Sequence, residues 1–154
     1  MTALNALRTR VDDDIDPPSV LVISDSYVGS SVVTALKQTA DTCLVTDQDG
    51  VAMRAPEGVR VVVGDEIRRA LLNDASADDA DAAVISMRTD HSNLLMTQLL
   101  RTEFDTDRVV VLLNDTQCSP AFEDIASALV CRSSVLATEL ERTLETTLPP
   151  SETA

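Results

Sequence analysis

Val20-Leu-Val-Ile-Ser-Asp-Ser-Tyr-Val-Gly29 is the segment from which the architecture follows, together with Asp47 eighteen residues further on. An apolar strand, a tight loop, the start of a helix and an acid that closes a second strand form the layout of a dinucleotide-binding turn. The usual pattern has three glycines, but Ser24 and Ser26 stand at the first two positions and only Gly29 is kept. The layout therefore predicts the fold, whereas the serines decide what the turn can bind.

Each glycine of such a turn has its own physical role: the first allows the sharp turn, the second lets the backbone approach a pyrophosphate, and the third lets the helix pack close to the sheet. Gly29 keeps the packing role, and we expect Ser24 to make the turn at some cost. Ser26 would place a side chain where the pyrophosphate sits, and Tyr27 adds bulk. The Asp25 carboxylate opposes the attraction of a helix start for anions. Nucleotide binding is therefore expected to be weak or lost.

The length and composition indicate one domain with a full aliphatic core. The chain has 154 residues, of which 44% are hydrophobic and only 2% aromatic. That hydrophobic fraction excludes wholesale disorder, and the length is sufficient for one core. Valine, leucine, isoleucine and alanine must fill it, and such residues suit strands that are buried on both faces.

The charge balance excludes several classes of partner. The net charge is −14, from 26 acidic and 12 basic residues. An anionic surface repels the phosphate backbone of nucleic acids and the headgroups of anionic membranes. Lys37 is the single lysine, and this replacement of lysine by arginine resembles the proteins of salt-in halophiles, in which acidic charge maintains solubility at high salt.

Neither the ends of the chain nor its cysteines indicate export. Residues 1–14 contain no apolar run of signal-peptide length, and no stretch is long enough to cross a bilayer. The three cysteines are widely spaced, without a CxxC pair or a disulfide framework. We therefore expect a cytoplasmic, soluble protein with no direct membrane insertion and no metal site.

Apolar runs alternate with helical patterns between an acidic N-terminal arm (1–18) and a short tail (149–154). The predicted strands are Val20–Ile23, Cys43–Thr46, Arg60–Val63, Ala82–Ser86, Val109–Leu113 and Leu129–Cys131. The predicted helices are Val28–Gln38, Ile67–Asp74, Ser92–Phe104, Ala121–Ala128 and Val135–Leu148. This alternation predicts an α/β fold with a doubly wound, mostly parallel six-stranded sheet in the order 3-2-1-4-5-6.

One crossover is predicted to be short. Gly50, Pro56 and Gly58 lie between Asp47 and Val59, which leaves room for at most a turn or two of helix. Further along, Ser119 and Pro120 are expected to begin the helix Ala121–Ala128, with serine as N-cap and proline at the first helical position.

Several short motifs follow the first turn in register. They are Val45-Thr-Asp47-Gln-Asp49, Val61-Val-Val-Gly-Asp65, Ala77-Asp-Asp-Ala-Asp-Ala-Ala-Val-Ile85, Arg88-Thr-Asp-His-Ser-Asn-Leu-Leu95 and Val111-Leu-Leu-Asn-Asp115. With these motifs, residues 19–148 resemble the regulator-of-potassium-conductance (RCK) domain, also called the TrkA N-terminal or KTN domain, in a halophilic archaeal type. The chain departs from the family at Leu113, where an arginine is usual, and at the missing glycines.

This resemblance implies regulation rather than catalysis. Such domains bind NAD(H), ATP or ADP at the carboxyl ends of the strands and pass the occupancy to a membrane potassium channel or transporter. They usually form homodimers in which the last helix crosses to the partner, and Val135–Leu148 would be that helix here. Its apolar positions form a stripe at Val135, Leu136, Leu140, Leu144 and Leu148. That stripe packs either on its own sheet or on a second copy.

The resemblance and the first turn together define a set of candidate nucleotide contacts. These are Ser24, Ser26, Tyr27, Val28, Gly29, Asp47, Asp65 and Arg88. Asp47 is either the acceptor for the ribose hydroxyls or a solvated acid. Asp65 either lines the adenine side or caps a helix that begins near Glu66, and we favour the cap. Arg88 either holds a phosphate or pairs with Asp90.

The remaining polar candidates are assigned to structure rather than ligand. His91 is expected at a helix start on the surface, and Asn93 is expected to support that start. Cys118 precedes a predicted helix, which can lower the pKa of a thiol. Cys43 and Cys131 are expected to be small buried apolar residues.

Three other functions are alternatives to a regulatory subunit. A structural or dimerisation module that has lost its ligand is favoured by the serines and Asp25. An NAD(P)-dependent oxidoreductase is disfavoured, since the chain has no Tyr-x-x-x-Lys motif and no substrate domain. A phosphoacceptor receiver domain needs a lysine at the end of the fifth strand, where Leu113 and Asn114 stand.

Overall fold

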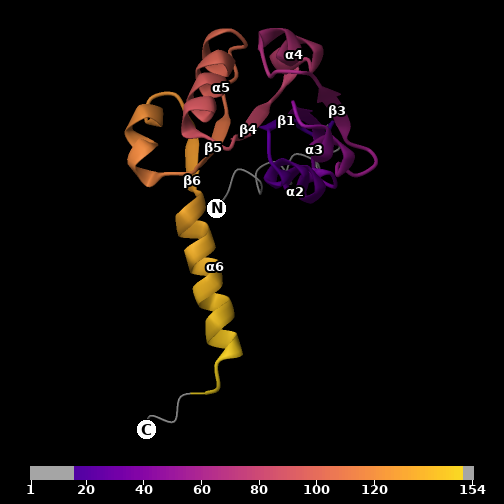
Figure 1. Ribbon diagram of the computed structural model, residues 1–154. Helices are drawn as coiled ribbons and strands as arrows, with labels where there is room; N and C mark the ends of the chain where they lie inside the picture. The colour runs from indigo at the N-terminus through magenta and orange to yellow at the C-terminus, as the bar shows by residue number, and fades with distance from the viewer. Residues whose placement is uncertain (1–15, 151–154) are drawn as a thin grey trace.

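A computed structural model describes residues 16–150 of the chain, so the predicted ends 1–15 and 151–154 lie outside the described residues. The centre is a six-stranded parallel sheet in the order β3-β2-β1-β4-β5-β6 (Figure 1). The strands are β1 (Ser19–Ser24), β2 (Asp41–Thr46), β3 (Arg60–Val63), β4 (Ala82–Ser86), β5 (Val109–Leu113) and β6 (Ala128–Cys131). The predicted doubly wound sheet and its strand order are confirmed.

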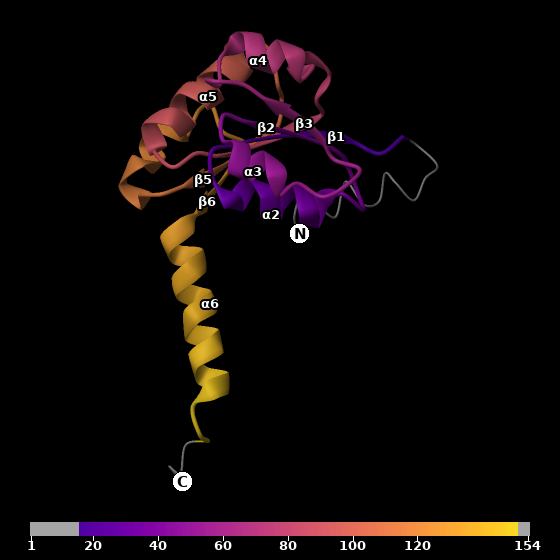
Figure 2. The ribbon, with the colours of Figure 1, turned by 45° about the vertical axis from the view of Figure 1, so that its right-hand side comes forward.

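Helices cover the two faces of the sheet, except for the last one, which projects away from it. They are α2 (Tyr27–Leu36), α3 (Asp49–Met53), α4 (Arg69–Asp74), α5 (Asp90–Thr102) and α6 (Arg132–Thr147), with 3-10 turns η1 (Ala77–Asp79) and η2 (Thr116–Phe122). Helices α2 and α3 lie on one face, and α4 and α5 on the other (Figure 2). The second crossover helix, α3, has only five residues, in agreement with the short connection predicted for it.

Alternate residues of the central strands feed two separate apolar cores. In β1, Leu21 and Ile23 pack with the α4 and α5 side, and Val20 and Val22 pack with the α2 and α3 side. Val22 and Ile23 are both fully buried. Burial on both faces explains why these strands are continuous aliphatic runs rather than alternating ones.

The predicted helix Ala121–Ala128 is wrong. The chain forms the 3-10 turn η2 instead, and Asp115 caps it by accepting a hydrogen bond from the Gln117 backbone N–H at 3.0 Å. Pro120 therefore lies inside the turn, where it has no N–H to donate to an α-helical ladder. Phe122 is buried at the end of the turn, and the chain returns to the sheet directly from there.

Two other helix starts differ from the prediction. Helix α4 begins at Arg69, with Arg68 as N-cap, because Ile67 is buried as an anchor before the helix. The preferred role of Asp65 as a cap is therefore wrong. Helix α6 begins at Arg132, directly after β6, and none of its residues is buried. The alternative in which this helix packs along its own sheet is not what the structure shows.

Helix α6 projects away from the sheet (Figures 1 and 2). It leaves part of the sheet uncovered on the side of α2. In β5, Val109 and Val111 are buried against α5, whereas Val110 and Leu112, which point to the other face, are only partly buried. Val130 of β6 is 38% exposed.

At Gly29, α2 packs against β1 without room for a side chain. A Cβ added at Gly29 would lie 2.3 Å from Cβ of Ser24, far inside van der Waals contact, with Leu44 Cδ1 next at 3.4 Å. We expect Gly29→Ala to destabilise the fold by about 1–3 kcal/mol. In a Ser24→Gly background, Gly29→Ala should instead stabilise the fold, because alanine is more favourable than glycine inside a helix by about 0.5–1 kcal/mol. Chemical unfolding of the four variants gives the coupling.

The same destabilisation by Gly29→Ala in both backgrounds would contradict this account of the contact. It would mean that the strain comes from elsewhere around α2 and not from the Ser24 side chain.

Candidate functional site

The turn between β1 and α2 is closed by the buried hydroxyl of Ser24. Ser24 Oγ donates a hydrogen bond to the Ser86 carbonyl at 2.9 Å and accepts one from Ser86 Oγ at 2.9 Å, which ties β1 to β4. It also accepts a hydrogen bond from the Ser26 backbone N–H at 3.2 Å. In a glycine-rich turn that N–H is free to face a phosphate. Here a side chain of the protein already occupies it.

Asp25 bridges the point at which the sheet order reverses. Its carboxylate accepts a hydrogen bond from the Arg88 backbone N–H at 2.8 Å. Ser26 is the N-cap of α2, but its hydroxyl makes no capping hydrogen bond and lies 3.4 Å from Ser24 Oγ. The first turn thus carries a carboxylate and two hydroxyls where a dinucleotide fold normally offers bare backbone.

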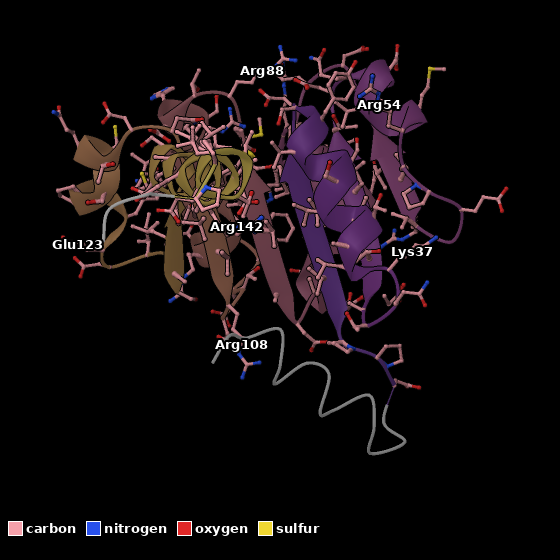
Figure 3. All side chains as sticks on the ribbon, turned by 90° about the horizontal axis from the view of Figure 1, so that it is seen from below. Lys37, Arg54, Arg88, Arg108, Glu123 and Arg142 are labelled. Carbon is pink, nitrogen blue, oxygen red and sulfur yellow. The ribbon has the colours of Figure 1, made fainter. Side chains whose placement is uncertain are left out.

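The other predicted contacts lie along the same carboxyl edge of the sheet. Asp47 follows β2 and accepts a hydrogen bond from Gln48 Nε2 at 3.2 Å. Asp65 is exposed in the turn after β3. Arg88 is exposed after β4 (Figure 3), and within residues 16–150 it makes no ion pair with Asp90. The structure therefore gathers Asp25, Ser26 and Arg88 at one point, with Asp47 and Asp65 on the neighbouring strands.

Asp90 is a hydrogen-bonding centre that the sequence analysis missed. Its carboxylate accepts hydrogen bonds from the backbone N–H groups of Asn114 (2.9 Å) and Asp115 (2.8 Å) and from Asn93 Nδ2 (3.0 Å). Desolvation alone raises the pKa of Asp90, but these bonds and one from Cys118 together lower it. The sequence feature that could have indicated this network is the pair Asp90 and Asn93 at the start of α5, together with Asn114-Asp115 after β5.

Asn93 supports the start of α5, as the sequence indicated. It is fully buried. Its Oδ1 accepts a hydrogen bond from the Met87 backbone N–H at 2.8 Å, and its Nδ2 also donates to the Leu112 carbonyl at 3.0 Å. Asn93 therefore fixes the ends of β4 and β5 relative to the helix. His91 is exposed on the same first turn.

The predictions for two cysteines are wrong. Desolvation and the nearby charges of Asp90 and Asp115 raise the pKa of Cys118 instead of lowering it. Cys131 is only partly buried, because it ends an edge strand as the N-cap of α6. Hydrogen bonds from Ser133, Ser134 and Thr116 lower its pKa to about 6. Cys43 is buried, as predicted.

A stacked pair of side chains at the same edge was also missed. The guanidinium of Arg54, at the end of α3, lies 3.8 Å from the centre of the Tyr27 ring. Figure 3 places Arg54 at the edge that also carries Arg88, opposite Arg108. Since Tyr27 is the first residue of α2, the pair sits beside the first turn. In the sequence, the one indication of this pair is the short connection between β2 and β3, which folds α3 back onto α2.

Within 16–150, no helix combines the length and apolar character that crossing a bilayer requires. The same residues contain no group of three or more histidine, cysteine, aspartate or glutamate side chains placed to hold a metal ion.

The parallel sheet, its strand order and the flanking helices define a Rossmann-like domain. The family model of the TrkA-N domain matches residues 20–132. The chain therefore belongs to the TrkA-N family, and the resemblance noted in the sequence is confirmed. No curated protein matches the chain in sequence.

Solved structures show the same fold. The RCK domain of GsuK is similar with a TM-score of 0.70 and 22% identity, over 84% of this chain and 28% of that one. The GsuK channel bound to NAD gives a TM-score of 0.69 at 22% identity, over 84% and 24%. This chain thus spans roughly a quarter of the GsuK chains.

Two shorter structures match nearly end to end. The TrkA-N domain of the inner membrane protein ybaL from Escherichia coli has a TM-score of 0.64 and 18% identity, over 88% of this chain and 99% of that one. The NAD(P)-binding domain of an exopolyphosphatase-related protein from Archaeoglobus fulgidus has a TM-score of 0.69 and 18% identity, over 82% and 97%.

The lowered pKa of Asp90 makes a testable contribution to stability. Because the folded-state pKa lies below the unfolded value, the stabilisation is present above about pH 3.9 and is lost as the pH falls through the folded value. We expect Asp90→Asn to cost about 1–2 kcal/mol at pH 7, discounted for partial solvation of the carboxylate. The difference from the native chain should shrink below pH 4 in chemical unfolding.

The matched control is Asp124→Asn, which changes an exposed acid that makes no ion pair among the described residues. An equal loss in both variants would show that general charge, and not the Asp90 network, sets the stability.

Proposed function

We propose that this chain is a non-catalytic, cytoplasmic regulatory subunit or domain of potassium transport that works as a homodimer. Membership of the TrkA-N family supports this assignment, as does the structural similarity to the GsuK channel. The observation that carries it is α6: a helix of 16 residues with no buried side chain extends from an otherwise well-packed domain. Such a helix needs a second surface.

The apolar side chains of α6 supply one half of the interface. Leu136 is 54% exposed, Leu140 69% and Leu144 56%. Their spacing of four residues places them on one side of the helix. Burying each of them would contribute about 1.5–3 kcal/mol. An isolated domain would gain nothing from leaving this stripe in water.

The uncovered part of the sheet supplies the other half. A strongly apolar cavity of about 260 Å³ lies where α6 leaves the domain, lined by Val28, Leu112, Arg132, Val135 and Leu136. It adjoins the half-buried face of β5. In the proposed dimer, α6 of one copy crosses to this face of its partner and covers it.

The cavity also connects the nucleotide turn to the dimer helix. Val28 belongs to the first turn of α2 and lines the same cavity as Leu136 of α6. A ligand that moves the first turn would therefore change the packing at the base of α6. The dimer can respond only by as much as the ligand's affinity differs between its two arrangements.

The ligand of this module is NAD(H), ATP or ADP, bound weakly at the carboxyl edge. In this proposal Asp47, after β2, accepts from the ribose hydroxyls, and Arg88, which is exposed after β4, faces a phosphate. The Ser24 network and the Asp25 carboxylate weaken the pyrophosphate contact. The second candidate, a structural dimerisation module without a ligand, is favoured by that same Ser24 network.

The dimer is tested by placing a charge in the stripe. Leu140→Asp should convert the protein from twice the chain mass of 16.5 kDa to a single mass in light scattering after size exclusion. Thr138→Asp is the matched control, because it adds the same charge on another side of the helix. A native chain that is monomeric at all concentrations would refute the dimer.

The nucleotide is tested by restoring the glycines. We expect Ser24→Gly/Ser26→Gly to bind NADH at least tenfold more tightly than the native chain, since an amide and space for the pyrophosphate are released. Thermal unfolding at high salt with NADH, NAD, ATP and ADP measures this, and a ligand at 100 times its dissociation constant adds about 2.7 kcal/mol.

Asp47→Asn added to the double variant should remove most of the gain in NADH affinity, because the carboxylate that contacts the ribose is replaced by an amide. If no nucleotide moves the midpoint of either protein, the ligand-free structural module is the better description.

A further inference from the structure

A second cavity lies beside the switch-point crevice, between α2 and the end of α3. Its volume is about 290 Å³, and it is lined by Tyr27, Ser30, Ser31, Thr34 and Arg54. All but Arg54 belong to α2, and Arg54 ends α3. The five lining residues therefore supply a phenol, three aliphatic hydroxyls and one guanidinium.

The guanidinium is held in place by the Tyr27 ring. Arg54 stacks at 3.8 Å from the ring centre. The hydroxyl end of the ring rests against Gly50, where an added Cβ would lie 3.1 Å from the phenolic oxygen. Stacking uses the face of the guanidinium and leaves its N–H groups free at the edge, which is the geometry that binds oxyanions through two parallel hydrogen bonds.

The electrostatic setting of this cavity favours an anion over a cation. The net charge is −14, yet no carboxylate lines the cavity. Within residues 16–150, no carboxylate comes within 4 Å of the Arg54 guanidinium. In a strongly acidic protein, a cation without a partner is where an anion experiences the least repulsion.

The hydroxyls divide into two groups. Ser30 Oγ donates to the Val51 carbonyl at 2.9 Å and thereby ties α2 to α3, and Thr34 Oγ1 donates to the Ser30 carbonyl at 2.8 Å. Ser31 is exposed, and its hydroxyl makes no hydrogen bond within the described part of the chain. Ser31 and Arg54 are thus available to a ligand, as is the Tyr27 hydroxyl, which also makes no hydrogen bond within residues 16–150.

We propose that this cavity is a phosphate site, in which Arg54 and Ser31 hold the oxygens of inorganic phosphate or of a phosphoryl group on a nucleotide. The site goes beyond the proposed function, because it requires neither the switch-point crevice nor the dimer. It places anion recognition between α2 and the end of α3, next to a first turn whose own amide is occupied by Ser24.

The experiment is a titration of the full chain with inorganic phosphate at constant KCl. Calorimetry and the line width of the phosphorus NMR signal measure the binding. Arg54→Gln should weaken phosphate binding about tenfold or more, in line with hydrogen bonds to a charged group. Arg54→Lys, which keeps the charge without the fork, should give an intermediate loss. Arg108→Gln, which changes an exposed arginine at the opposite edge of the sheet (Figure 3), is the matched control and should leave phosphate binding unchanged. Arg88→Gln reports separately on the crevice.

A second variant protects the test against a folding defect. Ser31→Asp adds a carboxylate at an exposed position inside the cavity and should abolish phosphate binding. Repeating the titration with ADP and with adenosine separates the two phosphate sources: binding of ADP that needs Arg54 indicates a nucleotide, and binding of inorganic phosphate alone indicates the free ion.

Three outcomes would overturn the proposal: a native chain that does not bind phosphate or ADP, binding that survives both Arg54→Gln and Ser31→Asp, or binding lost in Arg88→Gln instead. The last would move the anion into the crevice. Leu140→Asp should leave phosphate binding intact, so failure of the dimer and failure of this site are distinguishable.

Discussion

The fold depends on how closely α2 approaches β1. Gly29 lets the helix backbone rest on the Ser24 side chain, and the Ser24 hydroxyl then joins β1, β4 and the first turn through one oxygen. The two features are linked, because a helix that stood further away could not place the Ser26 amide within reach of that oxygen. The packing role of the turn has been kept, while its anion-binding role has been filled by the protein itself.

The sequence predicted the architecture well because its signals are collective. Six aliphatic runs with short connections allow few topologies, and a continuous run such as Val20–Ile23, which is buried on both faces, is typical of such a sheet. The prediction failed at Ala121–Ala128, where the free energies of an α-helix and of a 3-10 turn differ little. A serine followed by proline looked like a helix start, but Asp115 caps a 3-10 turn earlier and the burial of Phe122 ends it.

The candidate site was less accessible from the sequence because it depends on contacts between distant segments. Asp47 and Arg88 could be placed at the carboxyl edge from strand order alone. The Asp90 network joins residues more than twenty positions apart, and the Arg54 stack depends on how a five-residue helix folds back. The thiol of Cys131 was misjudged because its environment is set by hydroxyls that gather only when α6 begins directly after β6.

The stacked ring of Tyr27 has an optical consequence. The chain contains no tryptophan, and Tyr27 is its single tyrosine. Ultraviolet emission of the folded protein therefore originates almost entirely from one phenol, 48% exposed and in contact with a guanidinium. The molecule carries its own fluorophore at the junction of α2 and α3, so quenching or polarisation at that single position reports on local events there without any attached dye.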